Sequence, residues 1–185
     1  NIHYFAAAVR LYGSQVKGGY EYDGKTYDYK NDHTEGYDSC IGCHDSHTLE
    51  VKVEQCSMCH TDAKAVEDLK NVREPSSSMD YDGDGDVTEG MYFEIEGLQT
   101  LLVSALQAYS KEVTGAMIAY SPDAYPYFFT DPNADGQLTE EEAVTDNRYA
   151  TWTPRLLKAA YNLHLSIKDP GAYAHGNKYI VQLLY

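Results

Sequence analysis

Two short cysteine motifs carry the most distinctive chemistry in this chain. CIGCH (residues 40–44) and CSMCH (residues 56–60) each place two thiols three positions apart, with a histidine directly behind the second. This C-x-x-C-H spacing is typical of c-type haem attachment, in which both thiols bond the porphyrin and the adjacent histidine binds the iron. The sequence therefore predicts two covalently bound haem c groups. The attachment and proximal-ligand residues are Cys40, Cys43, His44, Cys56, Cys59 and His60.

Zinc and disulfide bonds are the alternative uses of these cysteines. Four cysteines permit three disulfide pairings, and C-x-x-C pairs also bind zinc. A zinc ribbon separates its pairs by roughly 15 to 20 residues, whereas 12 positions (residues 44–55) separate these. A zinc site would also leave the histidine after each pair without a role. Haem attachment is the preferred interpretation.

Each predicted iron has a second axial position, and the remaining histidines could fill it. The candidate distal ligands are His3, at the start of an alanine-rich segment, His33, just ahead of the first motif, and His47, three residues after the first proximal histidine. His175 is a weaker candidate, and His164 has the pattern of a helix-surface residue. The chain offers few suitable methionines, so we expect both irons to be bis-histidine.

An acidic segment, DPNADGQLTEEE (residues 131–142), matches the calcium-binding loop of an EF-hand. The ligands of such a loop alternate along the chain, a glycine allows the sharp turn at position 6, and a glutamate closes the site at position 12. Here the predicted calcium ligands are Asp131, Asn133, Asp135, Gln137 through its carbonyl, and Glu142. The alternative is an acidic turn without a metal.

A second acidic segment, DYDGDGDVTEGM (residues 80–91), matches the same pattern only in part. Its predicted calcium ligands are Asp80, Asp82, Asp84 and Asp86, the last through its carbonyl. Position 12 is Met91, so Glu89 or Glu94 would have to supply the missing carboxylate. We expect one or two calcium ions in all, in a structural role.

The elements that position these residues form a fold that is mainly α with a small β-hairpin. Helices are expected at residues 3–11, 62–73, 91–115, 139–147, 154–167 and from 173 onward. Residues 18–30 should form a hairpin around Asp23-Gly24, and residues 49–53 are long enough for a short strand. Val87 and Leu138 could meet as a short two-stranded bridge between the loops. Pro75 and the following serines mark a boundary. The expected organisation is a haem-packed dihaem region, residues 1–74, and a helical calcium-binding region, residues 75–185, packed on it.

The bulk composition limits the choice of partner. A formal charge of −15 among 185 residues disfavours binding to nucleic acid and favours cations. No apolar stretch approaches the roughly 20 residues needed for a membrane span. The sequence starts without a methionine or a signal peptide, as a processed chain or a piece of a longer one would.

The doubled C-x-x-C-H motif, the CHDSHTLEV run (residues 43–51), the NIHYFAAA opening and the C-terminal KDPGAYAHGNKYIVQLLY resemble the multihaem c-type cytochromes of respiratory bacteria and archaea. In that family a histidine shortly after an attachment motif commonly binds a neighbouring haem, which favours His47. Larger members carry more haems, so a histidine here could also serve a haem of an adjoining subunit.

The resemblance implies electron transfer in the periplasm or outside the cell, without catalysis. The chain could be a subunit of a cytochrome filament, and its partners would be redox proteins, copies of itself, or extracellular metal oxides or electrodes. Two alternatives remain. One is a haem enzyme of the nitrite reductase, hydroxylamine reductase or peroxidase type, or a fragment of one, with an open iron position. The other is a calcium-stabilised binding module in which the haems only stabilise the fold.

Overall fold

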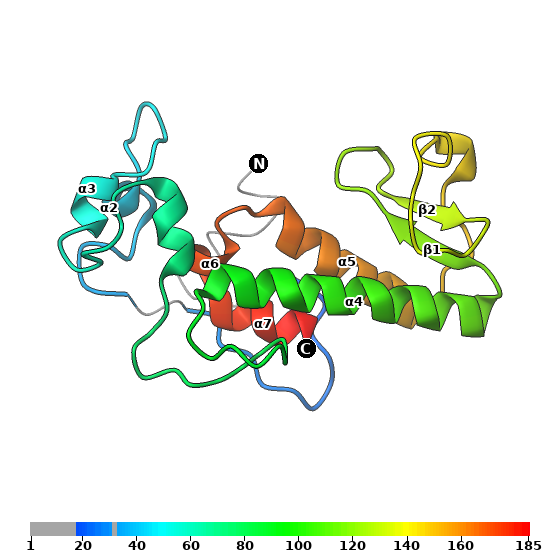
Figure 1. Ribbon diagram of the computed structural model, residues 1–185, viewed down its shortest axis with the longest axis horizontal. Coiled ribbons are helices and arrows are strands. Elements are labelled where there is room, and N and C mark those ends of the chain that lie inside the picture. The colour runs from blue at the N-terminus through cyan, green and yellow to red at the C-terminus, as the bar shows by residue number, and fades with distance from the viewer. Residues whose placement is uncertain (1–17, 31–32) are drawn as a thin grey trace.

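The structure is a computed structural model that describes residues 18–30 and 33–185. Its longest element, α4 (Met91–Thr114), runs through the middle of the molecule, with the cysteine motifs beyond one end and a two-stranded sheet beside the other (Figure 1). The other helices are α2 (Cys40–Cys43), α3 (Val53–Cys56), η1 (Val66–Asn71), η2 (Thr145–Asn147), α5 (Pro154–Lys168), α6 (Ala172–His175) and α7 (Asn177–Leu184); the strands are β1 (Met117–Tyr120) and β2 (Phe128–Asp131). This confirms the predicted class, mainly α with a small antiparallel sheet.

The long helices begin and end where local chemistry favours it. The Thr153 side chain accepts a hydrogen bond from the Leu156 backbone N–H, and Pro154 occupies the first helical position of α5. α4 ends at Thr114 and is capped by Gly115. The φ of Gly115 is 74°, a left-handed conformation that glycine adopts at little energetic cost. The helices predicted at residues 91–115 and 154–167 are therefore confirmed to within one residue.

One apolar core joins α4 to the C-terminal helix. Ile95 and Leu98 of α4 are buried in the same cluster as Tyr179 and Ile180 of α7, and Tyr27 from the N-terminal part of the chain joins them. Residues on both sides of the predicted boundary at positions 74 and 75 thus share this core.

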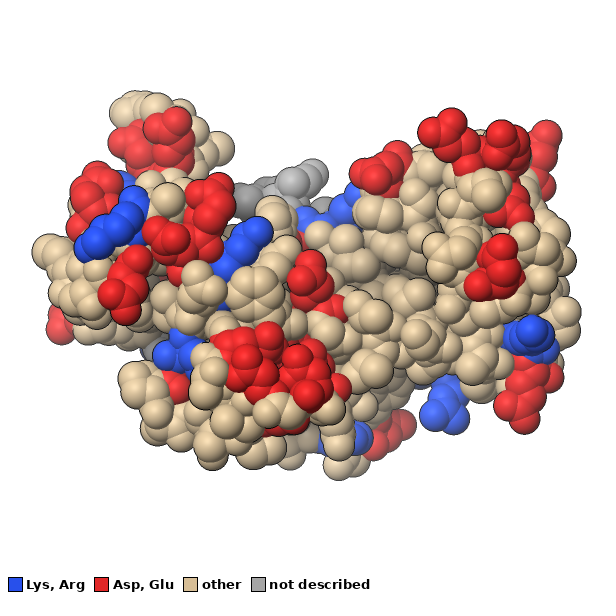
Figure 2. All heavy atoms as spheres, in the orientation of Figure 1, with Lys and Arg blue, Asp and Glu red and all other residues tan. Residues whose placement is uncertain are grey.

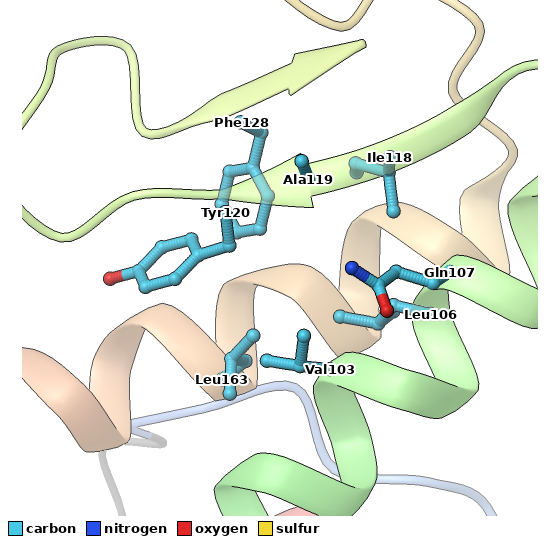
Figure 3. Close-up of a pocket in the computed structure, with 8 residues that line it drawn as sticks. All are labelled: Val103, Leu106, Gln107, Ile118, Ala119, Tyr120, Phe128 and Leu163. Carbon is cyan, nitrogen blue, oxygen red and sulfur yellow. The ribbon is translucent and has the colours of Figure 1, made fainter. Parts of the chain in front are cut away.

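A second core lies between the sheet, α4 and α5 (Figure 3). The two strands pair antiparallel, with Met117 opposite Asp131 and Tyr120 opposite Phe128. The cavity drawn in Figure 3 measures only about 10 Å³, which is room for at most one water molecule. This interface therefore acts as packing and does not offer a substrate site.

The hairpin predicted for residues 18–30 is wrong. A turn forms at Asp23-Gly24, but the flanking backbone groups bond to helix side chains instead of to each other. The Tyr20 N–H donates to the Asn162 side chain at 2.7 Å, and the Asp28 N–H donates to the Gln182 side chain at 2.7 Å. The hairpin of the fold is instead β1 and β2.

Other local predictions also differ from the structure. Residues 139–147 form a turn and the short η2 in place of a helix, and residues 62–73 contain only the 3₁₀ helix η1. Residues 49–53 contribute one isolated bridge, His44 with Val51, and the predicted Val87–Leu138 bridge does not form. The helix predicted at residues 3–11 lies outside the described residues. No helix among those described is long and apolar enough to cross a membrane.

Candidate haem and metal sites

In both cysteine motifs one turn of backbone leads from the first cysteine to the histidine; the first motif contains α2, whereas the second is a turn that follows α3. In the first motif the His44 N–H donates to the Cys40 carbonyl at 2.7 Å, and in the second the His60 N–H donates to the Cys56 carbonyl at 2.9 Å. Each of these hydrogen bonds spans four residues, so the histidine lies one helical turn beyond the first cysteine. This local geometry fits a porphyrin bonded through both thiols with the histidine beneath its iron.

The two attachment segments pack against each other. The Lys52 N–H donates to the Cys43 carbonyl at 2.9 Å, and the Lys52 ammonium donates to the Ile41 carbonyl at 2.6 Å. Burial raises the pKa of the Cys43 thiol, and the nearby Cys56 and Cys40 thiols raise it further. Two haems attached here would be neighbours.

The cysteines do not assemble the shell of a zinc site. Groups of three or more potential ligand atoms within 4.8 Å of one another consist, in the part of the chain that the structure describes, of aspartate and glutamate alone. None of the four cysteines is in a disulfide bond there.

His47 lies at an exposed turn between the two motifs. The Asp45 carboxylate accepts hydrogen bonds from the backbone N–H groups of His47 and Thr48, both at 2.9 Å, and these bonds lower the pKa of Asp45. The turn projects away from the helices in Figure 1. Among the described residues, the histidine rings that approach His44 and His60 are those of His175 and His33.

Each proximal histidine lies beside another histidine. The ring centres of His44 and His175 are 6.2 Å apart, and those of His60 and His33 are 6.3 Å apart. His175 comes from α6, near the C-terminal end of the chain, so sequence proximity gave little reason to prefer it. His3 lies outside the described residues.

His164 is buried, contrary to the prediction of a helix-surface residue. Its side chain is among those of Tyr120, Tyr127 and Phe128, with the Tyr120 hydroxyl 2.9 Å from its Nδ1. Burial, assisted by the charge of Lys168, lowers the pKa of His164 to about 4. The His164 side chain packs beside the second core, because the face of α5 that carries it lies against the sheet.

A cavity of about 320 Å³ lies between α4, α5 and α6. Tyr173 and Asp169 are among its lining residues. Burial, followed by the neighbouring Tyr92 and Cys56, raises the pKa of Tyr173. The cavity thus lies where the C-terminal end of α5 and the start of α6 approach α4.

The two acidic loops share one backbone conformation. The first carboxylate of each loop accepts hydrogen bonds from the N–H groups three and five residues later: Asp80 from Gly83 and Gly85, at 2.6 and 2.9 Å, and Asp131 from Ala134 and Gly136, at 2.8 and 2.7 Å. The four residues that donate these hydrogen bonds all have positive φ. The chain therefore curls the same way over both loops.

The first loop gathers its carboxylates most closely. Oxygens of Asp80, Asp82 and Glu94 lie within 4.8 Å of one another, as do those of Asp82, Asp84 and Glu89. Glu94 is fully buried in the first turn of α4, and it also accepts hydrogen bonds from Arg73 and from the Tyr81 N–H. Both glutamates considered as replacements for position 12 therefore approach the loop.

The charges in this cluster repel one another. Burial raises the pKa of Glu89 to about 7, and the carboxylates of Asp82, Asp84, Glu94 and Asp86 contribute. Burial likewise raises the pKa of Asp82. A divalent cation would offset this repulsion.

The second loop is arranged differently after its seventh position. Asp131 is buried at the end of β2, and Glu142 accepts hydrogen bonds from the Thr139 N–H and hydroxyl at 2.9 and 3.0 Å. A strand precedes this loop and a turn follows it. The paired helices of an EF-hand are thus absent around residues 131–142.

The acidic side chains collect on the surface around both loops. Figure 2 shows one patch over the loop that precedes α4 and another beside the sheet. Exposed residues of these loops include Asp84, Asp86, Glu140 and Glu141. Excess negative charge is therefore concentrated where a cation would reduce it most.

Comparison with known proteins relates the chain to polyhaem c-type cytochromes. It is similar to the C-type polyheme cytochrome OmcB of Geobacter sulfurreducens, in strains DL-1/KN400 and PCA, with 27% identity over the whole chain. It is also similar to the C-type polyheme cytochrome OmcC of Geobacter sulfurreducens strain PCA, with 26% identity over the whole chain. The chain spans only about a quarter of these relatives, 26% of OmcB and 25% of OmcC.

No protein-family profile matches the chain. No solved structure matches it either.

Proposed function

We propose that this protein is a dihaem c-type cytochrome that transfers electrons. The observation that carries the proposal is the repeated one-turn C-x-x-C-H geometry at residues 40–44 and 56–60, in two segments that contact each other. The similarity to polyhaem cytochromes over the whole chain supports the same conclusion.

When bound, the haems would supply reversible one-electron iron chemistry, and the protein would hold them and shield them from solvent. Cys40, Cys43, Cys56 and Cys59 would bond the porphyrins, and His44 and His60 would bind the irons. Because the two segments contact each other, haems bound to them would be close together, which would favour rapid electron transfer between them. No side chain of this protein needs to form or break a substrate bond.

Attachment of c-type haem takes place outside the cytoplasm, so we place the protein in the periplasm or outside the cell. Its partners are then redox proteins, further copies of itself in a filament, or extracellular metal oxides or electrodes. In a filament His3 would reach a haem at a subunit junction. The strongly acidic surface favours partners that are positively charged at the contact.

Calcium is the second cofactor of the proposal, bound in a structural role at one or both acidic loops. The first loop has the stronger support, because Glu89 and Glu94 bring carboxylates to the position that Met91 leaves without a ligand. In the second loop the shared hydrogen-bond pattern supports a site formed by residues 131–142.

The mass of the intact protein tests the haem proposal directly. The mass should exceed that of the polypeptide by two haems and should keep this excess after acid and organic extraction. The oxidised protein should be low-spin, and cyanide and nitrite should bind slowly, because both irons would have two histidine ligands. A bare polypeptide mass with bound zinc contradicts the cofactor, whereas two haems with a rapidly ligated high-spin iron would favour the haem-enzyme alternative.

A further inference from the structure

Two histidine pairs have a spacing that fits two ligands on opposite sides of one iron. An imidazole nitrogen binds a transition metal at about 2.0 Å and the ring centre lies roughly 1.1 Å behind it, so axial rings have centres roughly 6 Å apart. His44 and His175 are 6.2 Å apart, and His33 and His60 are 6.3 Å apart. The rings in these pairs are rotated by 43° and 34° relative to each other, a rotation that axial ligands can take about their common axis. The same separation thus recurs at both attachment motifs.

The hydrogen bonds of the first pair leave the correct nitrogen available to iron. His44 Nδ1 is 2.8 Å from the Leu49 carbonyl oxygen, which can only accept, so Nδ1 carries the proton. His175 Nδ1 is 2.9 Å from Asp169 Oδ1 and 3.1 Å from Oδ2, and it donates to this carboxylate for the same reason. In both rings the lone pair is therefore on Nε2. A histidine that binds a metal commonly donates its other N–H to a carbonyl or carboxylate in this way.

Asp169 is built into the fold as an anchor for His175. Its side chain is fully buried at the end of α5, and it also accepts a hydrogen bond from the Gly171 N–H at 3.0 Å. The imidazole of His175 packs closely on Gly171. A Cβ added at residue 171 would come within 2.6 Å of the ring carbon Cε1. The ring is therefore held by the carboxylate and has room only because residue 171 lacks a side chain.

The loop that carries His33 is also held against the first attachment motif. A Cβ on Gly42 would come within 2.4 Å of the Gly36 carbonyl oxygen, so the two segments are in close contact. His33 itself contacts Tyr37 edge-on, with ring centres 6.3 Å apart. This packing directs the segment ahead of the first motif toward the histidine of the second.

We infer that His175 is the distal ligand of the haem whose proximal ligand is His44, that His33 is the distal ligand of the haem whose proximal ligand is His60, and that Asp169 is a positioning residue that orients His175. This inference rests on the proposed dihaem function and refines its ligand set. The first haem then joins the N-terminal attachment segment to the C-terminal helices. His3 and His47 are not ligands within the isolated subunit.

The experiment uses the haem-loaded protein and four variants: His175→Ala, His33→Ala, Asp169→Asn and, as control, His47→Ala. Intact mass should show two haems in each. Electron paramagnetic resonance of the oxidised protein should show about half of the iron high-spin in His175→Ala and in His33→Ala. Added imidazole should return both variants to low-spin, and His47→Ala should remain fully low-spin. Asp169→Asn should stay low-spin while the reduction potential of one haem rises, because the ligand loses the electron-donating carboxylate.

The outcomes separate the ligand assignment from the proposed function. Two haems in a His175→Ala protein that remains fully low-spin overturn the assignment of His175, and a high-spin His47→Ala protein overturns the assignment of the pairs. A wild-type mass without haem overturns the proposed function as well. If His175→Ala does not fold, His175→Met keeps a ligand in place and should raise the potential of one haem; unchanged potentials in that variant contradict the assignment.

Discussion

The imidazole rings of His44 and His175 lie 6.2 Å apart, although one follows the first attachment cysteines and the other lies in the last helices of the chain. The candidate site of the first haem therefore draws on both ends of the described sequence. The shared core of Tyr27 with α4 and α7 supports the same close connection. Events at the haem and the stability of the C-terminal helices should be coupled as a result.

The first prediction concerns Gly171. Gly171→Ala should displace the His175 ring, because the new Cβ would meet Cε1 at 2.6 Å. We expect a partial high-spin signal from one haem and a loss of about 1–3 kcal/mol of stability from overpacking. Electron paramagnetic resonance and urea denaturation provide the measurements. Pro170→Ala, at an exposed neighbouring position, is the control and should leave the spin state unchanged.

The second prediction concerns calcium. Removal of calcium by a chelator should lower the melting temperature, because a ligand at a hundredfold excess over its Kd stabilises the folded state by about 2.7 kcal/mol. Asp82→Asn should remove most of the chelator effect of the first loop, and Glu142→Gln that of the second. Asp123→Asn, at an exposed carboxylate outside both loops, is the control. If elemental analysis finds no calcium and chelation leaves melting unchanged, both loops are acidic turns only.

The third prediction concerns pH and His164. Its pKa is lowered from 6.5 to about 4 in the folded protein, so the unfolded chain binds more protons between these values. The free energy of unfolding should therefore fall as the pH drops through this window, by at most about 3 kcal/mol from this residue. His164→Gln should flatten the slope between pH 6.5 and 4 in denaturation curves. An unchanged slope would assign the acid sensitivity to other groups.

The fourth prediction concerns Tyr179, which ties the N-terminal segment to α7. Its buried hydroxyl accepts from the Gly19 N–H at 3.1 Å and donates to Glu21 at 3.0 Å. Burial raises the pKa of Tyr179 to about 12. Tyr179→Phe should cost about 1–3 kcal/mol in urea denaturation, because it leaves buried polar groups without a partner.

The matched control for Tyr179 is Tyr125→Phe, at a tyrosine that is 75% exposed. This change should alter stability by less than about 0.5 kcal/mol. Equal effects of the two substitutions would show that the contacts of the Tyr179 hydroxyl contribute nothing.

Features that depend on residues close together in the chain could be predicted from the sequence. The C-x-x-C-H turns are local, since two residues separate the cysteines and one peptide bond joins the second cysteine to its histidine. The α4 and α5 helices follow from apolar periodicity and from local caps such as Thr153 and Gly115. The alternating ligands of residues 80–86 and 131–137 likewise specify the curl of each acidic loop.

Tertiary structure alone decided the relationships between distant residues. The segment around Asp23-Gly24 has the turn chemistry of a hairpin, but Asn162 and Gln182 offer its backbone better-placed partners than a second strand. The sequence pattern predicted His164 on the surface of its helix, but packing against Tyr120, Tyr127 and Phe128 buries it. His175 meets His44 only because Asp169 and Gly171 fix its ring where the chain returns to the first motif. Such contacts depend on the packing of whole elements, which local patterns do not encode.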